Sequence, residues 1–270
     1  MKHLFIGLAL ICLSALAAMS LLHTRAQTSS AAPAATRTPV VVELFTSEGC
    51  SSCPPADALL TKLFEGQPVG GAEVIAIEEH VDYWNSLGWM DPFSSIEWTI
   101  RQQQYAESFG SGSVYTPQMV VDGRSEFAGS RERQSEKEIA EAARRAKTDV
   151  AVTPDKPGED GKRKFTVCVR KLTGGTSGDT AEVWLAVTES KLQSAVTRGE
   201  NAGEQLHHTA VLRMLRKIGA ADASKDLSFV GDARVRLDKA WRPENSRVVV
   251  FVQERKSRKI LGAAAAELAR

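Results

Sequence analysis

The chain has 270 residues, of which 43% are hydrophobic and 25% charged, and its net charge at pH 7 is +1. This length predicts two globular domains. The near balance of charge argues against nucleic acid as a partner, because a nucleic-acid-binding protein needs a clustered basic face.

Residues 1–26 predict a secretory signal peptide. Lys2 provides a positive start, residues 4–22 are almost wholly apolar, and small residues around Ala26 suit cleavage. The apolar run is also long enough for a membrane anchor, which is the alternative. Residues 27–39, rich in Ser, Ala and Thr, predict a linker. Cleavage leaves 32 basic and 33 acidic residues, a net charge of −1, and no membrane contact is expected afterwards. Export places the cysteines where disulfides persist.

The segment from Val40 to Leu63 organises the rest of the chain. An apolar run over Val40–Phe45 predicts a buried strand. After a polar turn comes Cys50-Ser51-Ser52-Cys53, and the two prolines that follow suit the first turn of a helix. Apolar residues then recur at helical spacing, at Ala56, Leu59, Leu60, Leu63 and Phe64. The two cysteines therefore lie where a strand passes into a helix.

That position predicts thiol chemistry. A helix N-terminus stabilises a nearby anion, and the thiolate is the form that attacks disulfides. We expect Cys50, the outer cysteine, to attack and the buried Cys53 to resolve. A structural disulfide is the alternative, but a four-residue ring gains little stability from closure. A copper or zinc site completed by His80, His207 or His208 is a third interpretation. No second cysteine pair exists, so we assign no metal ligands and no cofactor.

The next elements follow in chain order. Residues 73–77 predict a second buried strand, and residues 80–90 form an aromatic stretch that precedes a helix. Asp91-Pro92 predicts the start of that helix, which continues to about Phe109. Residues 118–121 and 124–127 predict a hairpin around Asp122-Gly123. A closing helix is expected from Ser135 to Ala146.

This order of elements resembles the thioredoxin fold over residues 40–148. Two motifs carry the resemblance: Cys50-Ser51-Ser52-Cys53-Pro54 at the junction of strand and helix, and Tyr115-Thr116-Pro117 before the hairpin. The resemblance implies that Pro117 follows a cis peptide bond and lies against the cysteine pair. A cis bond costs little before proline. Thr116 is then expected to present backbone groups to an extended substrate, as in strand addition.

Three further residues are possible supports of this site. Glu43 lies on the incoming strand, one residue farther from the first cysteine than the buried acid of thioredoxins, and an ordinary strand-end glutamate is the alternative. His80 and Trp84 belong to the aromatic stretch, which either binds a peptide or packs a large loop. Ser51 and Ser52 carry no charge that would lower the pKa of Cys50, so the redox direction stays open.

Nearly the whole mature chain also resembles a narrower group, a secreted bacterial thioredoxin-like family of unknown function. The matching stretches are ELFTSEGCSSCPPAD, HVDYWNSLGWMDPFS, YTPQMVVDG and GENAGEQLHH. The resemblance implies a fold and secretion, which we expect to be into the periplasm. It implies no substrate.

Residues 149–270 predict a smaller, β-rich second domain. Short apolar or alternating segments separated by turns suggest a sandwich; they cover residues 165–169, 183–187, 206–212, 229–237, 248–252 and 260–265. In a strand, His207 and His208 would point to opposite faces, so we expect solvated or interface residues rather than a chelating pair. The predicted fold class is thus an α/β thioredoxin-like domain followed by a mostly β, sandwich-like domain.

The leading functional hypothesis is an exported thiol–disulfide oxidoreductase that acts on protein disulfides through Cys50 and Cys53. Its partner is then a protein thiol or disulfide. The first alternative is a non-catalytic protein-binding module that uses the aromatic stretch and the β domain. The second is a carrier of copper or another soft metal that uses the same cysteines.

Overall fold

The computed structural model describes residues 37–155 and 162–268. The predicted signal peptide, and the predicted linker up to residue 36, lie outside the described residues. Strands account for 42% of the structure and helices for 20%. Within the described ranges, no helix is long and apolar enough to cross a membrane.

The first half of the chain has the predicted order of elements. Its strands and helices are β1 (Thr38–Thr46), α2 (Pro54–Gly66), β2 (Ala72–His80), α3 (Ile96–Phe109), β3 (Gln118–Val121), β4 (Ser125–Ala128) and α4 (Glu132–Ala143), with a 3-10 turn η1 (Asn85–Leu87). The predicted start of the second helix is wrong, because α3 begins after Ser95, whose side chain accepts a hydrogen bond from Glu97 N. Asp91 does not cap a helix, since its carboxylate binds the backbone N–H groups of Glu48 and Phe93.

The second half contains only strands and one 3-10 turn among its described residues. These are β5 (Val150–Pro154), β6 (Lys162–Arg170), β7 (Ala181–Glu189), β8 (Leu192–Ala195), β9 (Gln205–His208), β10 (Val211–Ala220), β11 (Leu227–Arg236), η2 (Pro243–Asn245), β12 (Ser246–Glu254) and β13 (Ile260–Glu267). All six predicted apolar segments overlap these strands.

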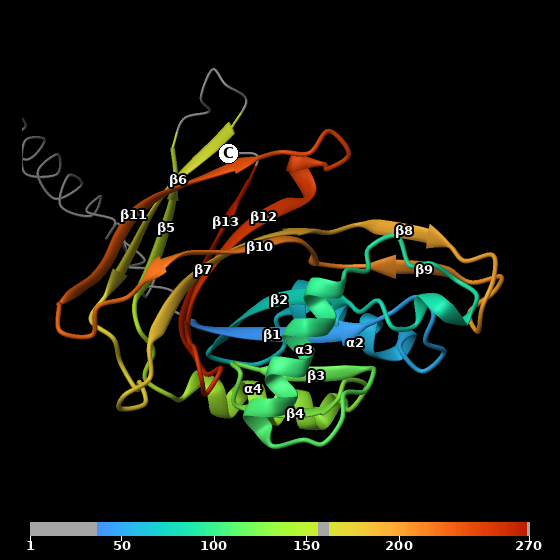
Figure 1. Cartoon of the computed structure of the whole chain (residues 1–270), viewed down its shortest axis with the longest axis horizontal. Helices are drawn as coiled ribbons and strands as arrows, with labels where there is room; N and C mark the ends of the chain where they lie inside the picture. Colours follow the sequence, from blue (N-terminus) through green and yellow to red (C-terminus); the bar gives the residue numbers. More distant parts are fainter. Residues whose placement is uncertain (1–36, 156–161, 269–270) are drawn as a thin grey trace, which may run out of the picture. The chain divides into compact units, whose positions relative to one another are not determined.

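The predicted fold class is wrong, because one mixed sheet runs through both halves of the chain. Its eight strands have the order β13-β12-β7-β10-β2-β1-β3-β4. The halves join where Val211 of β10 pairs in parallel with Glu78 of β2. The edge of β2 is therefore continued by strands from the second half, and the predicted α/β domain does not stand apart from a separate sandwich. Figure 1 shows the first-half strands beside the long strands of the second half.

One face of the large sheet carries two kinds of cover. Helices α2 and α4 pack on β1, β2 and β3, and the three-stranded sheet β11-β6-β5 packs on β7, β12 and β13. The opposite face of the sheet is concave and encloses a separate hydrophobic core, which includes Val41 of β1, Phe251 of β12 and Trp98 of α3. The sheet curves so far that β13 approaches β3, and Ile260 N at the start of β13 donates a hydrogen bond to the carbonyl oxygen of Asp122, just after β3, at 2.8 Å. Both faces of β1 and β2 are thus buried.

Because side chains alternate along a strand, the polar residues at the ends of β1 and β2 divide between the two faces. Val42 and Ala76 pack under α2, so Thr46, Glu78 and His80, which keep the same alternation, lie on the α2 face. Glu43 and Glu79 lie on the α3 face, where Arg101 binds both carboxylates. The first group of residues belongs to the candidate site.

Candidate functional site

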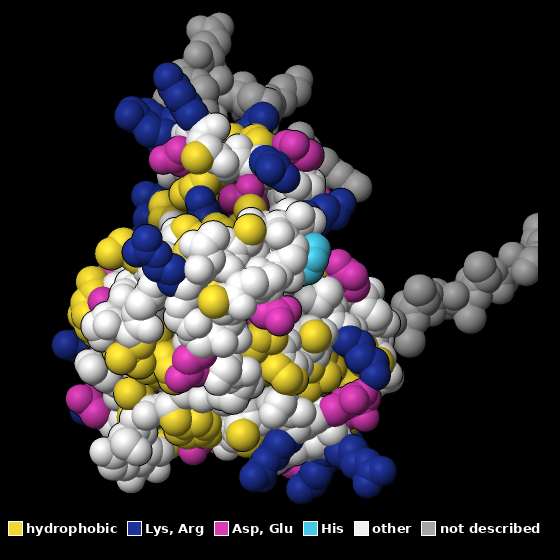
Figure 2. Space-filling view, turned by 90° about the vertical axis from the view of Figure 1, so that its right-hand side faces the viewer, with side chains coloured by type: hydrophobic (Ala, Val, Ile, Leu, Met, Phe, Trp, Pro, Cys, Tyr) yellow, Lys and Arg dark blue, Asp and Glu magenta, His cyan; other side chains and the backbone are white. Residues whose placement is uncertain are grey.

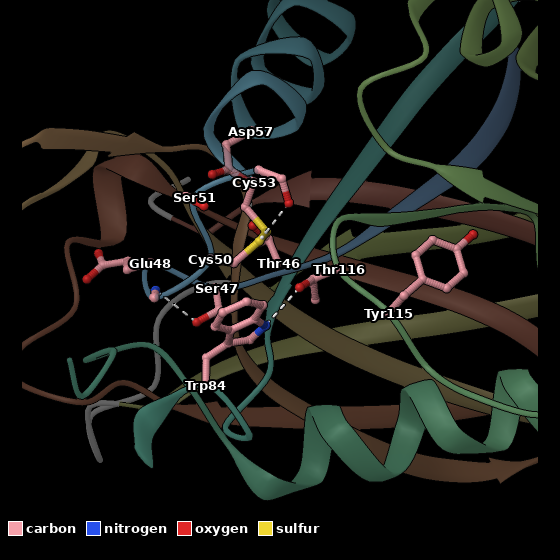
Figure 3. The surroundings of a disulfide bond; sticks show 12 residues. Thr46, Ser47, Glu48, Cys50, Ser51, Cys53, Asp57, Trp84, Tyr115 and Thr116 are labelled. Carbon is pink, nitrogen blue, oxygen red and sulfur yellow. Dashed lines mark hydrogen bonds between the residues drawn. A yellow bond between two sulfur atoms is a disulfide. The ribbon is translucent and has the colours of Figure 1, made fainter. Parts of the chain in front are cut away.

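A disulfide between Cys50 and Cys53 occupies the turn before α2 (Figure 3). Cys53 is the N-cap residue of the helix, and its carbonyl oxygen accepts hydrogen bonds from Ala56 N and Asp57 N. Both cysteines are 0% exposed, so the expected difference between an outer and a buried cysteine is absent. Cys50 Sγ lies 3.4 Å from the hydroxyl of Ser52, which is itself exposed. The position at the helix terminus is as predicted, whereas the complete burial was not expected.

The aromatic stretch covers one side of the disulfide turn. A Cβ atom added to Gly49 would lie only 3.1 Å from Cβ of Trp84, so the turn approaches this residue closely. The indole N–H of Trp84 donates to Thr116 Oγ1 at 2.8 Å, and the indole N–H of Trp89 donates to Glu48 Oε2 at 2.7 Å. Trp84 therefore links the cysteine turn to the loop that carries Thr116, as Figure 3 shows.

A second cover comes from the turn between β8 and β9, residues 196–204, which we call the hairpin turn. The amide of Asn201 donates to Glu48 O at 2.8 Å and to Cys50 O at 3.1 Å, and this side chain is buried. The carboxylate of Glu200 accepts hydrogen bonds from the backbone N–H and the hydroxyl of Ser51. The second half of the chain thus holds the cysteine turn closed.

The predicted cis peptide bond between Thr116 and Pro117 is confirmed. Pro117 lies near the start of α2, because Pro117 and Ala56 are both close to Gly129. A Cβ on Gly129 would meet Ala56 Cβ at 3.1 Å and Pro117 Cβ at 3.3 Å. Gly129 N also donates to Pro117 O at 2.9 Å. The loop is therefore fixed against the same helix end that carries the cysteines.

A buried acid lies one helical turn after Cys53. The carboxylate of Asp57 accepts a hydrogen bond from Thr46 Oγ1 at 2.6 Å, and both residues surround the disulfide in Figure 3. Burial and the negative charge of Glu78 raise the pKa of Asp57 to about 7. A carboxyl group with this pKa exchanges its proton near neutral pH.

Two buried histidines lie next to this acid and share one carboxylate. His208 Nδ1 lies 2.8 Å from Glu78 Oε1, and His80 Nε2 lies 3.3 Å from the same oxygen. The outer nitrogens have their own carboxylates, because His80 Nδ1 lies 2.7 Å from Asp91 Oδ2 and His208 Nε2 lies 3.1 Å from Glu48 Oε1. We call these five residues the histidine cluster.

The carboxylates of the histidine cluster favour the protonated, positively charged form of both imidazoles. Burial lowers the pKa of His208, but the charge and hydrogen bonds of Glu78 and Glu48 outweigh burial and raise it to about 9. Burial likewise lowers the pKa of His80, and the Asp91 carboxylate overcomes this effect, so the pKa lies well above its ordinary value. Glu78 is held as a carboxylate, since the two imidazoles lower its pKa to about 2 against the opposing effect of burial.

The predicted site residues are only partly brought together. Trp84 and Thr116 surround the disulfide. His80 lies in the histidine cluster on the α2 face. Glu43 lies on the opposite face of β1, where Tyr105 Oη donates to its Oε2 at 2.5 Å and Arg101 forms an ion pair with it.

The interpretation of His208 as a solvated or interface residue is wrong, because it is buried. Its neighbour His207 is exposed, so the two do point to opposite faces. Sequence reasoning also missed Asp57, Glu78 and Asn201. The Glu78-x-His80 spacing on a strand could have shown two polar side chains on one face. Nothing local connects either of them with His208.

The fold and the site define a mixed α+β protein with a Cys-x-x-Cys disulfide enclosed by a hairpin. The chain belongs to the family described as "Protein of unknown function (DUF1223)", whose model matches residues 41–253. This match confirms the expected membership of a family of unknown function and does not confirm that the family is thioredoxin-like. No curated protein sequence matches the chain.

Two solved structures share the fold. Protein AGR_C_4864 from Agrobacterium tumefaciens is 26% identical with a TM-score of 0.63, and the match covers 85% of this chain and 94% of that one. HBP35 of Porphyromonas gingivalis is 18% identical with a TM-score of 0.61, and the match covers 87% of this chain and 76% of that one.

Proposed function

We propose that this protein is an exported thiol–disulfide oxidoreductase that acts on protein disulfides. The observation that carries the proposal is the Cys50–Cys53 disulfide at the N-terminus of α2. The unpaired N–H groups and positive end of a helix favour a thiolate there once the disulfide is reduced. Closure of so short a ring adds little to stability, which supports a chemical rather than a structural use of the bond.

In the reducing direction, the Cys50 thiolate attacks one sulfur of a substrate disulfide. A Cys50–substrate disulfide forms, and the other substrate sulfur leaves as a thiolate. Cys53 then attacks the Cys50 sulfur as a thiolate, restores the Cys50–Cys53 bond and releases the second substrate thiolate. Two electrons pass from the protein to the substrate, and the reverse sequence oxidises a substrate dithiol.

Asp57 supports the second step. To become a nucleophile, the buried Cys53 thiol must lose its proton, and Asp57 lies one turn further along the same helix. Its pKa of about 7 allows it to accept that proton near neutral pH and to return it in the reverse reaction. The hydrogen bond from Thr46 fixes its orientation.

A protein substrate requires the hairpin turn to move, because both cysteines are buried. The contacts between Glu200 and Ser51 are exposed, and exposed polar contacts are held weakly against water. The segment between β2 and α3 offers apolar surface for such a substrate, with Leu87 58% and Met90 76% exposed. Figure 2 shows the side of the molecule on which β8 and β9 lie in Figure 1. Hydrophobic side chains are exposed on this side between charged ones.

The proposal includes export. The predicted signal peptide over residues 1–26 supports it, and so does the disulfide, because such bonds persist in oxidising compartments such as the periplasm.

Reduction of a protein disulfide such as that of insulin tests the proposal. We expect turnover by the wild-type protein, none by Cys50→Ser, and a covalent complex with Cys53→Ser whose linkage to Cys50 is located by mass spectrometry. Cys168→Ser is the matched control, since this free cysteine lies on β6, outside the site, and it should retain activity. If wild type and Cys50→Ser behave alike, the proposal fails.

The second candidate is a non-catalytic protein-binding module. The complete burial of both cysteines favours it. In this case the disulfide stays closed, and a partner binds the apolar surface of the β2–α3 segment. Undiminished partner binding by Cys50→Ala, together with resistance of the native disulfide to reduction, would select this function.

A further inference from the structure

We propose that Glu78, His80 and His208 bind one divalent transition-metal ion, with Zn²⁺ as the ion that the ligand set fits best. Their ligand atoms all lie within 4.8 Å of one another, and all three residues are buried. Imidazole nitrogen with one carboxylate oxygen is a ligand set that zinc accepts. None of the three ligands is a cysteine, and the two cysteine sulfur atoms are bonded to each other.

The orientation of His80 is the first observation in favour of the site. Its Nδ1 is paired with Asp91 Oδ2 at 2.7 Å. Its Nε2 is buried and makes no well-aligned hydrogen bond among the described residues, with Glu78 Oε1 lying 3.3 Å away. Metal-binding histidines use the same arrangement, in which a carboxylate holds one nitrogen so that the lone pair of the other faces the ion. His80 Nε2 is thus directed into the cluster at Glu78 Oε1.

His208 approaches the same point from the second half of the chain. Glu48 holds its Nε2, which leaves Nδ1 facing Glu78 Oε1 at 2.8 Å. Zinc lies about 2 Å from its ligands, so ligand atoms around a tetrahedral ion are roughly 3.3 Å apart. The separations of 3.3 Å and 2.8 Å between Glu78 Oε1 and the two imidazoles lie close to this value, and the two imidazole nitrogens lie within 4.8 Å of each other.

The surroundings also suit a bound ion. The second oxygen of Glu78 is fixed by Thr209 N at 2.9 Å, and the ring of Phe93 lies edge-on against both imidazoles, with centroids 5.4 and 5.5 Å away. With three protein ligands, a fourth position is left for water.

A cavity lies beside the strand that carries His208. A cavity of about 350 Å³ between α2 and β9 is lined by Asp57, Thr61, Leu206 and His207 among others. Its lining includes Leu206 and His207, the two residues before His208.

Metal uptake by the purified, EDTA-treated protein tests this proposal. We expect one equivalent of Zn²⁺ by calorimetry and elemental analysis. We also expect Co²⁺ to give the visible bands of a four-coordinate nitrogen and oxygen site, without thiolate charge transfer. His80→Ala and His208→Ala should each weaken Zn²⁺ affinity at least 100-fold. Asp91→Asn, which releases His80 from its carboxylate, should weaken it about 10- to 100-fold.

Two controls distinguish binding at this site from binding at the exposed histidine or at the cysteines. His207→Ala changes the exposed neighbour on the same strand and should bind Zn²⁺ as the wild type does. The double variant Cys50→Ser/Cys53→Ser should also retain Zn²⁺, so loss of disulfide exchange and loss of metal binding are independent results. The proposal is overturned if the wild-type protein takes up no stoichiometric Zn²⁺ or Co²⁺, if neither histidine variant weakens binding, or if the cysteine variant abolishes it. If the histidine variants do not fold, the Co²⁺ spectrum of the wild type decides.

Discussion

Replacing Asn201 with Ala should make the Cys50–Cys53 disulfide react faster with external thiols. The side chain of Asn201 is the buried part of the cover, since its amide donates to the carbonyl oxygens of Glu48 and Cys50. Alanine removes both hydrogen bonds and leaves the covalent structure of the cysteine turn unchanged. If the hairpin turn must open before a thiol reaches the sulfurs, the reaction rate follows the population of the open form.

The size of the effect follows from these two contacts. A hydrogen bond contributes a net 0.5–1.5 kcal/mol to stability, so the loss of two favours opening by about 1 to 3 kcal/mol. Because about 1.4 kcal/mol corresponds to a factor of ten, the open population should rise about 5- to 150-fold. The rate of reduction should rise by the same factor.

The assay treats the native protein with dithiothreitol, quenches samples with an alkylating agent and follows the mass shift on Cys50 and Cys53. Gln193→Ala changes an exposed residue of β8 in the same hairpin and should react at the wild-type rate. Leu185→Ala removes a buried side chain from the core between the large sheet and the three-stranded sheet, at a cost of about 2 to 5 kcal/mol. This variant therefore shows how much of the reaction proceeds through global unfolding. A wild-type rate for Asn201→Ala, or an equal acceleration by Leu185→Ala, would refute the hairpin turn as the cover.

Three more substitutions test the buried charges. Asp57→Asn should slow disulfide exchange at pH 7 at least tenfold and remove the inflection near pH 7 from the pH–rate profile, because it removes the group that exchanges a proton there; an unchanged profile would contradict the proton transfer. Burial and the neighbouring Glu43 raise the pKa of Glu79 well above its ordinary value of 4.5, against the opposing charge of Arg101. The folded state therefore binds this proton more tightly, and the resulting stability is present below pH 4.5 and is lost as the pH rises toward the folded pKa. Glu79→Gln should reduce that loss by about 1.4 kcal/mol for each unit of the shift, measured as urea midpoints between pH 5 and 8, and a pH dependence equal to the wild type would count against it. Arg101→Leu leaves the buried carboxyl groups of Glu43 and Glu79 without their partner and should cost about 3 to 5 kcal/mol in urea unfolding, whereas a loss below 1 kcal/mol would show that the network relaxes.

Local patterns were sufficient for the order of the elements in the first half, although not for the first residues of α3, predicted at Asp91-Pro92, and α4, predicted at Ser135. The apolar run before Cys50, the prolines after Cys53 and the helical spacing of the leucines that follow are all short-range signals, and β1 and α2 form where they indicate. The position of the cysteines at the helix N-terminus follows from the same signals. So does the hairpin at Asp122-Gly123, since its turn residues are adjacent in sequence.

The union of the two halves depends on long-range pairing, which these signals do not contain. A single pair, Val211 with Glu78, joins β10 to β2, and the turn-rich sequence around residue 149 looked like a domain boundary. The cover of the disulfide has the same origin, because Asn201 lies in a turn that shows no apolar pattern. Local reasoning therefore predicted an exposed cysteine where the structure has a buried one.

The charged end of β2 shows how long-range pairing determines the environment of the site residues. Glu78, Glu79 and His80 are consecutive polar residues, and a run of this kind normally marks an exposed strand end. Here both faces of β2 are covered, so alternation sends Glu79 to Arg101 on one side, and Glu78 and His80 to His208 on the other. Each buried charge is matched by a partner distant in sequence. Since His208 and Asn201 both come from the β8–β9 hairpin, the second half completes the histidine cluster and closes the disulfide with one element, and a chain that ended near residue 148 would have neither.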